Sequence, residues 1–190
     1  DESAPCTGDF SGGDGSAGTP YLIDNVCALQ NMSANLSAHY ALANNIDASI
    51  TSGWNSGEGF EPVGCDWDVQ FTGSFDGRGY TITGLFIDRP ATYYVGLFGY
   101  TDGCSITNVS LSSVNITGYG DVGGLIGRNE GGTINNSSIA GNVSGYSDVG
   151  GLVGDTDGTI SNSHSTANVS SDVDDNEHIG GLVGMNEGTI

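Results

Sequence analysis

The chain contains no lysine, and its fixed positive charges are limited to Arg78, Arg89 and Arg128. Against them stand 23 aspartates and glutamates, which give a formal net charge of −20 at pH 7. A surface of this charge repels phosphate backbones and anionic lipid headgroups, so nucleic acid and acidic membrane surfaces are poor partners. The same composition suits either a high-salt habitat, where screening tolerates crowded carboxylates, or an ordinary acidic secreted protein.

Long apolar runs and paired cysteine motifs are also missing. No stretch of 18 apolar residues occurs, so the sequence predicts no membrane-spanning helix. The four cysteines form no Cys-X-X-Cys pair, and no histidine lies at ligand spacing, which disfavours zinc. We expect two disulfides among them, in an oxidising compartment. Of the three possible pairings we favour Cys6 with Cys27 and Cys65 with Cys104, because each joins neighbours in sequence.

The first residue is Asp1 rather than methionine. A mature exported protein whose signal peptide has been removed would begin in this way, and so would a trimmed chain. Together with the expected disulfides, this favours a secreted or cell-surface location.

Glycine, in contrast, is abundant, with 33 residues, while only 14% of the chain is charged. Many turns and short strands are typical of such a composition. The chain also repeats itself, because four blocks ending in Leu, an apolar residue and Gly recur every 27 to 30 residues, at 94–99, 122–127, 149–154 and 179–184. Each is followed by a turn and a second short strand, and the first three by a third strand.

Such a unit cannot bury its apolar face alone, but stacked units can. Stacking is expected to place the leucines of the four blocks, Leu97, Leu125, Leu152 and Leu182, in one interior column. Ile106, Ile134 and Ile160 would form a second column, and Ile116, Val143 and Val169 a third. Each stacked aliphatic side chain contributes on the order of 2 kcal/mol. We therefore predict an all-β, parallel and right-handed β-solenoid with three-strand coils of about 27 residues.

The recurrent glycines have a separate reason, since a coil corner needs a close backbone approach that a β-carbon would block. Valine at Gly124 or Gly151 should therefore be worse than a surface change. A helical interpretation fails because Gly-Gly within each block costs about 1 kcal/mol per glycine.

The block Val149-Gly-Gly-Leu-Val-Gly154, together with segments such as Asn186-Glu-Gly-Thr-Ile190, resembles the GLUG-motif repeats of bacterial and archaeal surface proteins. The upstream runs 71–85 and 18–23 resemble segments that commonly precede those repeats, so the resemblance covers nearly the whole chain. It implies a β-solenoid in a surface or adhesin-like setting, and it carries no catalytic residues to transfer.

Three regions are expected along the chain. Residues 1–50 form an N-terminal cap, residues 51–94 form non-repetitive first coils, and residues 95–190 form the repeats. In the cap, Asp24 is expected to begin a short helix that runs to about Leu36 and covers the strand edges at the solenoid end. The chain stops at Ile190 within a repeat, which suggests either a longer natural protein or an edge covered by another molecule, as in a head-to-tail filament.

Eight Asn-X-Ser/Thr sequons occur, at Asn31, Asn35, Asn108, Asn115, Asn135, Asn136, Asn142 and Asn168. One repeat position holds Asn108, Asn136 and Asn162, the last without a sequon, and is best explained as a structural asparagine ladder. The better glycosylation candidates of the repeats each precede an inward Ile or Val and so face outward, and they are Asn115, Asn142 and Asn168. Two further candidates, Asn31 and Asn35, lie on the cap. Glycans on adjacent coils would crowd one another at about 4.8 Å spacing.

The 30-residue repeat contains an acidic insertion whose carboxylates suit calcium, namely Asp172, Asp174, Asp175 and Glu177. Their spacing differs from that of an EF-hand loop, and a solvated acidic loop is the favoured interpretation. No other cofactor is expected.

An enzyme on this scaffold would need groups that the chain supplies poorly. Polysaccharide lyases need cations to hold the acidic sugar, and no Gly-X-Ser-X-Gly elbow occurs. The many carboxylates mean that composition alone does not exclude a pair for glycoside hydrolysis. The histidines, His39, His164 and His178, are scattered along the sequence. Carbohydrate binding is the stronger alternative, through an aromatic group in the non-repetitive half that comprises Trp54, Phe60, Trp67, Tyr93 and Tyr94.

We therefore expect a non-catalytic, extracellular structural protein, a surface rod or a filament subunit that polymerises head to tail. The alternatives are a carbohydrate-binding adhesin module and, third, a polysaccharide-degrading β-helix enzyme. The expected partners are further copies of the chain and surface glycans.

Overall fold

A computed structural model describes residue 6, residues 8–171 and residues 178–190. One short α-helix and three 3₁₀ helices lie in the first third of the chain, namely α1 (Val26–Gln30), η1 (Asn31–Ala34), η2 (Ser49–Gly53) and η3 (Asn55–Gly57). The remaining elements are strands: β1 (Tyr21–Ile23), β2 (His39–Leu42), β3 (Ile46–Asp47), β4 (Ser74–Asp76), β5 (Thr81–Thr83), β6 (Phe86–Asp88), β7 (Phe98–Asp102), β8 (Ser105–Thr107), β9 (Ser110–Thr117), β10 (Gly120–Gly123), β11 (Ile126–Glu130), β12 (Thr133–Asn135), β13 (Ser138–Gly145), β14 (Ser147–Gly150), β15 (Val153–Thr156), β16 (Thr159–Ser161), β17 (His164–Ser165), β18 (Asn168–Ser171), β19 (Ile179–Gly180) and β20 (Val183–Asn186).

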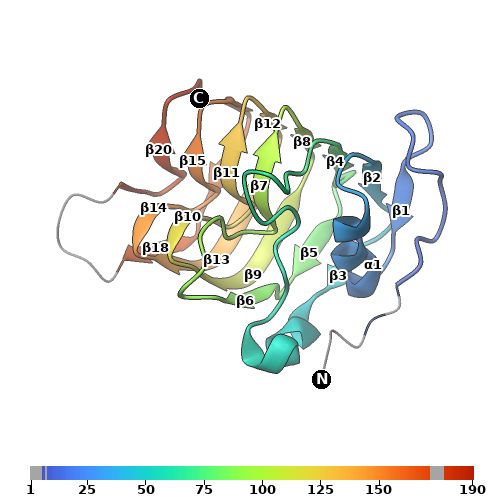
Figure 1. Cartoon of the computed structure of the whole chain (residues 1–190), viewed down its shortest axis with the longest axis horizontal. Helices are drawn as coiled ribbons and strands as arrows, with labels where there is room; N and C mark the ends of the chain where they lie inside the picture. Colours follow the sequence, from blue (N-terminus) through green and yellow to red (C-terminus); the bar gives the residue numbers. More distant parts are fainter. Residues whose placement is uncertain (1–5, 7, 172–177) are drawn as a thin grey trace.

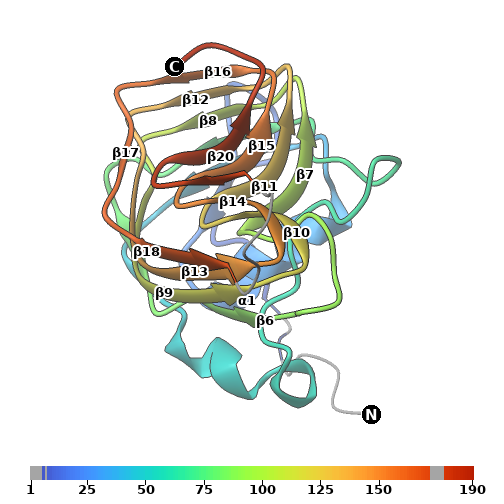
Figure 2. The same ribbon diagram turned by 90° about the vertical axis from the view of Figure 1, so that its left-hand side faces the viewer.

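The strands form a parallel β-solenoid of about four turns, which confirms the predicted fold. Successive coils lie side by side in Figure 1, and Figure 2 shows them nearly superimposed along the stacking direction. One sheet has the order β1-β2-β4-β8-β12-β16 and a second has the order β20-β15-β11-β7. The other two are β10-β14-β19 and β17-β13-β9-β5-β3, with β18 and β6 attached to β13 and β9.

The interior consists of columns of equivalent side chains. Leu97, Leu125 and Leu152 are fully buried, and Leu182 in the last described coil packs half-buried against the same core. The Leu125 amide donates to the Leu152 carbonyl at 2.9 Å, and the Leu152 amide donates to the Leu182 carbonyl at 2.8 Å. Leucines at this position in successive coils are therefore joined by backbone hydrogen bonds, at the spacing of neighbouring parallel strands.

The other columns follow the same rule. Ile106, Ile134 and Ile160 are paired in register between β8, β12 and β16. Ile116, Val143 and Val169 are paired in register between β9, β13 and β18. Neighbours of these residues alternate outward, as the two-residue period of a strand requires.

Each repeating coil contributes to four sheets, one more than the three strands expected. The Val-Gly-Gly-Leu block, predicted as one strand, is divided into two, since β10 ends at Gly123 and β11 begins at Ile126. The corner lies at Gly124 and Leu125, where the backbone turns from one sheet to the next while Leu125 stays buried.

The N-terminal helix is shorter than predicted and begins one residue later. Asn25, rather than Asp24, is the N-cap, and its Oδ1 accepts from the amides of Cys27 and Ala28 at 2.9 Å each. The helix ends at Gln30 and continues as the 3₁₀ turn η1. It buries Val26 and Leu29 against the N-terminal end of the solenoid, where Figure 1 shows it beside β1 and β3. The division into 1–50, 51–94 and 95–190 stays a prediction, although β1 and β2 already belong to the six-stranded sheet.

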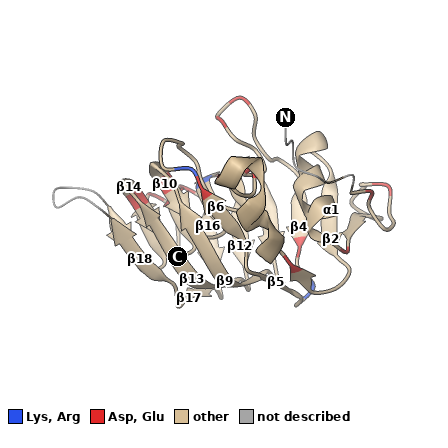
Figure 3. Ribbon diagram, turned by 90° about the horizontal axis from the view of Figure 1, so that it is seen from below, with Lys and Arg blue, Asp and Glu red and all other residues tan. Residues whose placement is uncertain are grey.

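The negative charge is unevenly distributed over the coils. Strands β8, β12, β16, β9, β13 and β18 contain no Asp, Glu, Lys or Arg, and those of them that Figure 3 labels are tan, whereas β3, β4 and β6 of the same sheets each contain an aspartate. Acidic residues gather instead in the loops of the N-terminal half and near β10 and β14. Among the described residues, no helix has both the length and the apolar character needed to cross a membrane.

Candidate functional site

One of the two predicted disulfides is present in the structure. Cys6 and Cys27 form a disulfide, which joins the N-terminal segment to α1. The second predicted pair is wrong, because Cys65 and Cys104 are free thiols. Cys104 is buried between β7 and β8, whereas Cys65 is exposed, so their side chains lie in different environments. Burial raises the pKa of Cys104 to about 11, and burial with the nearby Glu61 and Asp66 raises the pKa of Cys65, so neither thiol is an activated nucleophile.

The asparagine ladder adopts a conformation that explains its residue type. Asn108, Asn136 and Asn162 all have left-handed backbones, with φ between 50° and 56°. Asn136 Nδ2 donates to Asn108 Oδ1 at 2.8 Å, and Asn108 Nδ2 donates to Asp76 Oδ1 at 2.9 Å. Asn162 instead donates to Asn135 Oδ1 at 2.9 Å, so its side chain bonds to the residue before the ladder position.

The glycosylation candidates are exposed. Asn115, Asn142 and Asn168 lie opposite one another on β9, β13 and β18, and Asn168 Nδ2 donates to Asn142 Oδ1 at 3.1 Å. N-glycosylation of Asn168 would attach the sugar to the nitrogen that donates this bond, whereas Asn142 takes part in it through its amide oxygen. Asn31 and Asn35 are exposed on the cap, where Asn31 Nδ2 donates to the Gly8 carbonyl at 3.0 Å. Their modification stays a prediction.

The proposed calcium ligands, Asp172, Asp174, Asp175 and Glu177, lie outside the described residues. Within the described part of the chain, no three His, Cys, Asp or Glu residues are grouped so as to hold a metal ion.

A buried polar ladder runs through the core and was missed by the sequence analysis. Thr101 Oγ1 donates to Asn129 Oδ1 at 3.1 Å, and Asn129 Nδ2 donates to Thr156 Oγ1 at 2.8 Å. All three residues are fully buried. One repeat position holds Thr101, Asn129, Thr156 and Asn186. The sequence signal for this ladder was therefore a polar residue that recurs at one position of every coil.

A second missed feature is a charged corner formed by β10, β11, β14 and β15. Arg128 Nη1 forms an ion pair with Asp155 Oδ2 and lies 4.0 Å from Asp121 Oδ2. His178 Nδ1 lies 2.7 Å from Asp148 Oδ1. Asp121 and Asp148 share one repeat position, and both have a left-handed backbone with φ of 49°. The repeat therefore stacks carboxylates directly above one another.

Replacing Asp121 with asparagine is expected to stabilise the protein. Burial, and then the Asp148 carboxylate, raise the pKa of Asp121 to about 6, although Arg128 opposes them. The folded state therefore binds the Asp121 proton more tightly than the unfolded state. As pH rises from about 4 to 6 and this proton is lost, the free energy of unfolding of the protein decreases. In D121N the free energy of unfolding should rise by about 2 kcal/mol at pH 7.5 and by roughly half as much at pH 5. Urea unfolding at both pH values would measure this change.

The matched control for that measurement is Asp88→Asn, which removes the same charge from an exposed position. A gain in D88N as large as that in D121N would assign the effect to net charge rather than to the corner.

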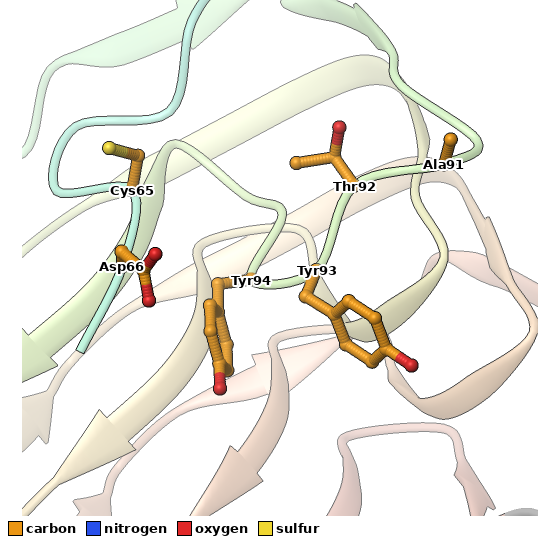
Figure 4. A pocket seen from close by; sticks show the side chains of 6 residues that line it. All are labelled: Cys65, Asp66, Ala91, Thr92, Tyr93 and Tyr94. Atoms are coloured by element: carbon orange, nitrogen blue, oxygen red, sulfur yellow. The ribbon is translucent and has the colours of Figure 1, made fainter.

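The aromatic residues proposed as a sugar-binding group divide into two sets. Trp54 and Phe60 are buried and pack on each other at 6.5 Å between ring centroids, so they belong to the core and cannot act as platforms. Trp67 and Tyr93 are exposed over 66% and 52% of their surfaces. Tyr93 and Tyr94 line a pocket of about 460 Å³, shown in Figure 4, together with Cys65, Asp66, Ala91 and Thr92.

The histidines do not assemble a catalytic site in the described residues. His39 Nδ1 lies 2.7 Å from Ser74 Oγ, and the two residues are paired between β2 and β4 within the six-stranded sheet. His178 pairs with Asp148 at the charged corner, and His164 lies exposed on β17. None of the three lines the pocket of Figure 4.

Parts of two much longer proteins are similar in sequence to this chain. Halomucin of Haloquadratum walsbyi is 39% identical over 145 residues, which cover 71% of this chain and 2% of halomucin. A protein of Evansella cellulosilytica named "Putative Gly-rich membrane protein" is 45% identical over 185 residues, which cover 93% of this chain and 21% of that protein. The chain therefore corresponds to a small part of each relative. No protein-family profile matches it.

The fold is shared with a solved structure of much lower sequence identity. The crystal structure of a "putative immunoglobulin A1 protease from Bacteroides ovatus" has a TM-score of 0.64 and 17% identity, over 93% of this chain and 65% of that one. At this identity the similarity concerns the backbone alone. The chain is thus a β-solenoid whose sequence is similar to segments of much larger proteins, halomucin among them.

Proposed function

We propose that this chain is a segment of a non-catalytic, extracellular structural protein, a rod exposed at the cell surface. The observation that carries the proposal is the in-register stacking of coils, in which Leu97, Leu125 and Leu152 fill the interior. A solenoid of this kind lengthens by adding coils, each held by its neighbours alone. The similarity to halomucin and the Cys6–Cys27 disulfide support a location outside the cytoplasm.

The narrower assignment to GLUG-type repeats belongs to the same proposal. It is supported by the Val-Gly-Gly-Leu blocks at 122–125 and 149–152 and the related block at 179–182, each of which forms the same corner between two sheets.

End-to-end association is the second part of the proposal. The last described coil presents strands β18, β19 and β20 as sheet edges, with Ile179 and Leu182 partly exposed beside them. A further coil, from the same chain or another copy, would pair with these edges as β15 pairs with β20.

Immunogold electron microscopy of native cells tests both parts. With an antibody raised against residues 95–190, we expect label on the outer surface along elongated particles many coils long. Label confined to the cytoplasm would contradict the surface role, and uniformly short, single particles across salt concentrations would contradict end-to-end association.

A matched pair of variants isolates the edge in the purified chain. Leu182→Glu places a charge where a further coil would stack, and should abolish any concentration-dependent polymer seen by analytical ultracentrifugation. Ile50→Glu changes an exposed residue of η2 and should leave the polymer unchanged. Equal behaviour of the two variants would argue against the edge as the contact.

A further inference from the structure

The pocket of Figure 4 is formed by two segments, one that precedes the repeats and one that leads into the first repeat block. The loop at Cys65 and Asp66 forms one side, and residues 91–94, between β6 and β7, form the other. Figure 4 shows the rings of Tyr93 and Tyr94 projecting to the same side of their loop, with Tyr94 next to Asp66. A volume of about 460 Å³ lies in the range of small-molecule sites.

The two tyrosine rings are held in place by further tyrosines. Tyr93 packs edge-to-face on Tyr119 at 4.9 Å, and Tyr119 stacks on Tyr146 at 5.0 Å with an interplanar angle of 3°. Tyr94 packs edge-to-face on Tyr100 at 5.0 Å. The pocket rings are therefore supported by the coils beneath them, while half of the Tyr93 surface stays open to a ligand.

The electrostatic environment of the pocket favours a cation. Asp66 is exposed and lines it, whereas Arg89 and Arg128 are engaged in ion pairs, Arg89 with Glu58 at 3.0 Å and Arg128 with Asp155. Burial raises the pKa of Tyr94, the Asp121 and Asp66 carboxylates add to the increase, and Arg128 opposes it. The carboxylates thus impose a negative potential on this ring, and they repel anionic ligands.

We propose that this pocket binds an amino sugar in its protonated, ammonium form. The ammonium group would pair with the Asp66 carboxylate and lie near the electron-rich tyrosine faces. The apolar face of the sugar ring would pack on Tyr93, and its hydroxyl groups would reach the Thr92 hydroxyl. A neutral sugar would leave Asp66 without a charge partner, and an acidic sugar would be repelled. This site is independent of the structural role proposed above, and adds a ligand to the rod.

The test is a calorimetric titration of the chain with two tetrasaccharides that differ in N-acetylation, and therefore in charge. The glucosamine tetramer carries amines, and the N-acetylglucosamine tetramer has the same rings with neutral amides. The glucosamine tetramer should bind at least about fivefold more tightly. Asp66→Asn and Tyr93→Leu should each weaken its binding by about fivefold or more, while Tyr93→Phe, which keeps the ring, should retain it.

Matched controls separate a site from general attraction to an acidic protein. Asp68→Asn removes a charge two residues from Asp66, and Tyr80→Leu removes an exposed tyrosine, and neither residue lines the pocket. Both should leave the affinity within about twofold, and circular dichroism should show every variant folded. Equal losses in D66N and D68N, equal affinity for the two tetramers, or the absence of saturable binding would overturn the proposal.

Discussion

Valine in place of Gly124 is expected to destabilise the chain by about 3 kcal/mol or more, whereas the same substitution at Gly181 should change its stability by less than about 1 kcal/mol. The two glycines occupy the same position in the repeat. A β-carbon on Gly124 would lie 2.6 Å from the Gly151 carbonyl oxygen of the next coil and would clash with the Ile139 side chain. Gly181, in the last described coil, has nothing within 4 Å of that position.

Because the pair differs only in what lies next to it, the comparison tests coil stacking directly. Gly151→Val should resemble Gly124→Val, since its β-carbon would meet the Gly181 carbonyl and Ser165. Urea unfolding followed by circular dichroism measures all three variants. Similar losses at Gly124 and Gly181 would show that the glycines serve local backbone conformation rather than the approach of neighbouring coils.

The stacking of coils could be predicted from the sequence because it depends on periodic residues. Leu125 and Leu152 recur at one spacing, and parallel pairing of equivalent strands buries both at once. The fourth sheet was not predicted, because Gly-Gly-Leu reads equally well as a continuous strand and as a corner. Only the position of the next coil decides between them.

The errors concentrate in segments that occur once. Pairing Cys65 with Cys104 relied on sequence proximity, but one residue is exposed and the other is buried. Trp54 and Phe60 resembled an exposed aromatic group, yet they fill the core of the first coils. A residue without counterparts in other repeats carries no periodicity that shows which way it points.

The sequence analysis named Tyr93 and Tyr94 as candidate sugar-binding residues, but it could not predict the pocket that they line. Asp66 and Tyr93 are 27 residues apart in sequence and come together only because their two loops meet beside the coils. The tyrosines that support the pocket, in contrast, do follow the repeat, since Tyr119 and Tyr146 are separated by one coil and stack on each other. Their repetition was a visible signal for an aromatic column on the surface.

Asn129→Ala is expected to destabilise the chain by about 2 kcal/mol, although alanine is small enough to fit its position. The Asn129 side chain accepts from Thr101 and donates to Thr156 and to the Gly132 carbonyl. All these partners are shielded from water, so removal of the amide leaves several polar groups unpaired at once. Thermal and urea unfolding should both register the loss.

Asn186→Ala provides the matched control, because Asn186 pairs with Thr156 in the same column but is exposed on the last described coil. Water can replace its hydrogen bonds, so the expected loss is below about 0.5 kcal/mol. Equal, small losses at both positions would mean that the buried ladder adds little and that the aliphatic columns alone hold the coils together. A large loss at Asn129 alone would establish that polar contacts, as well as apolar ones, fix each coil to the next. Hydrogen bonds require one alignment of the two coils, whereas apolar contacts are non-directional and would resist a shift between coils far less.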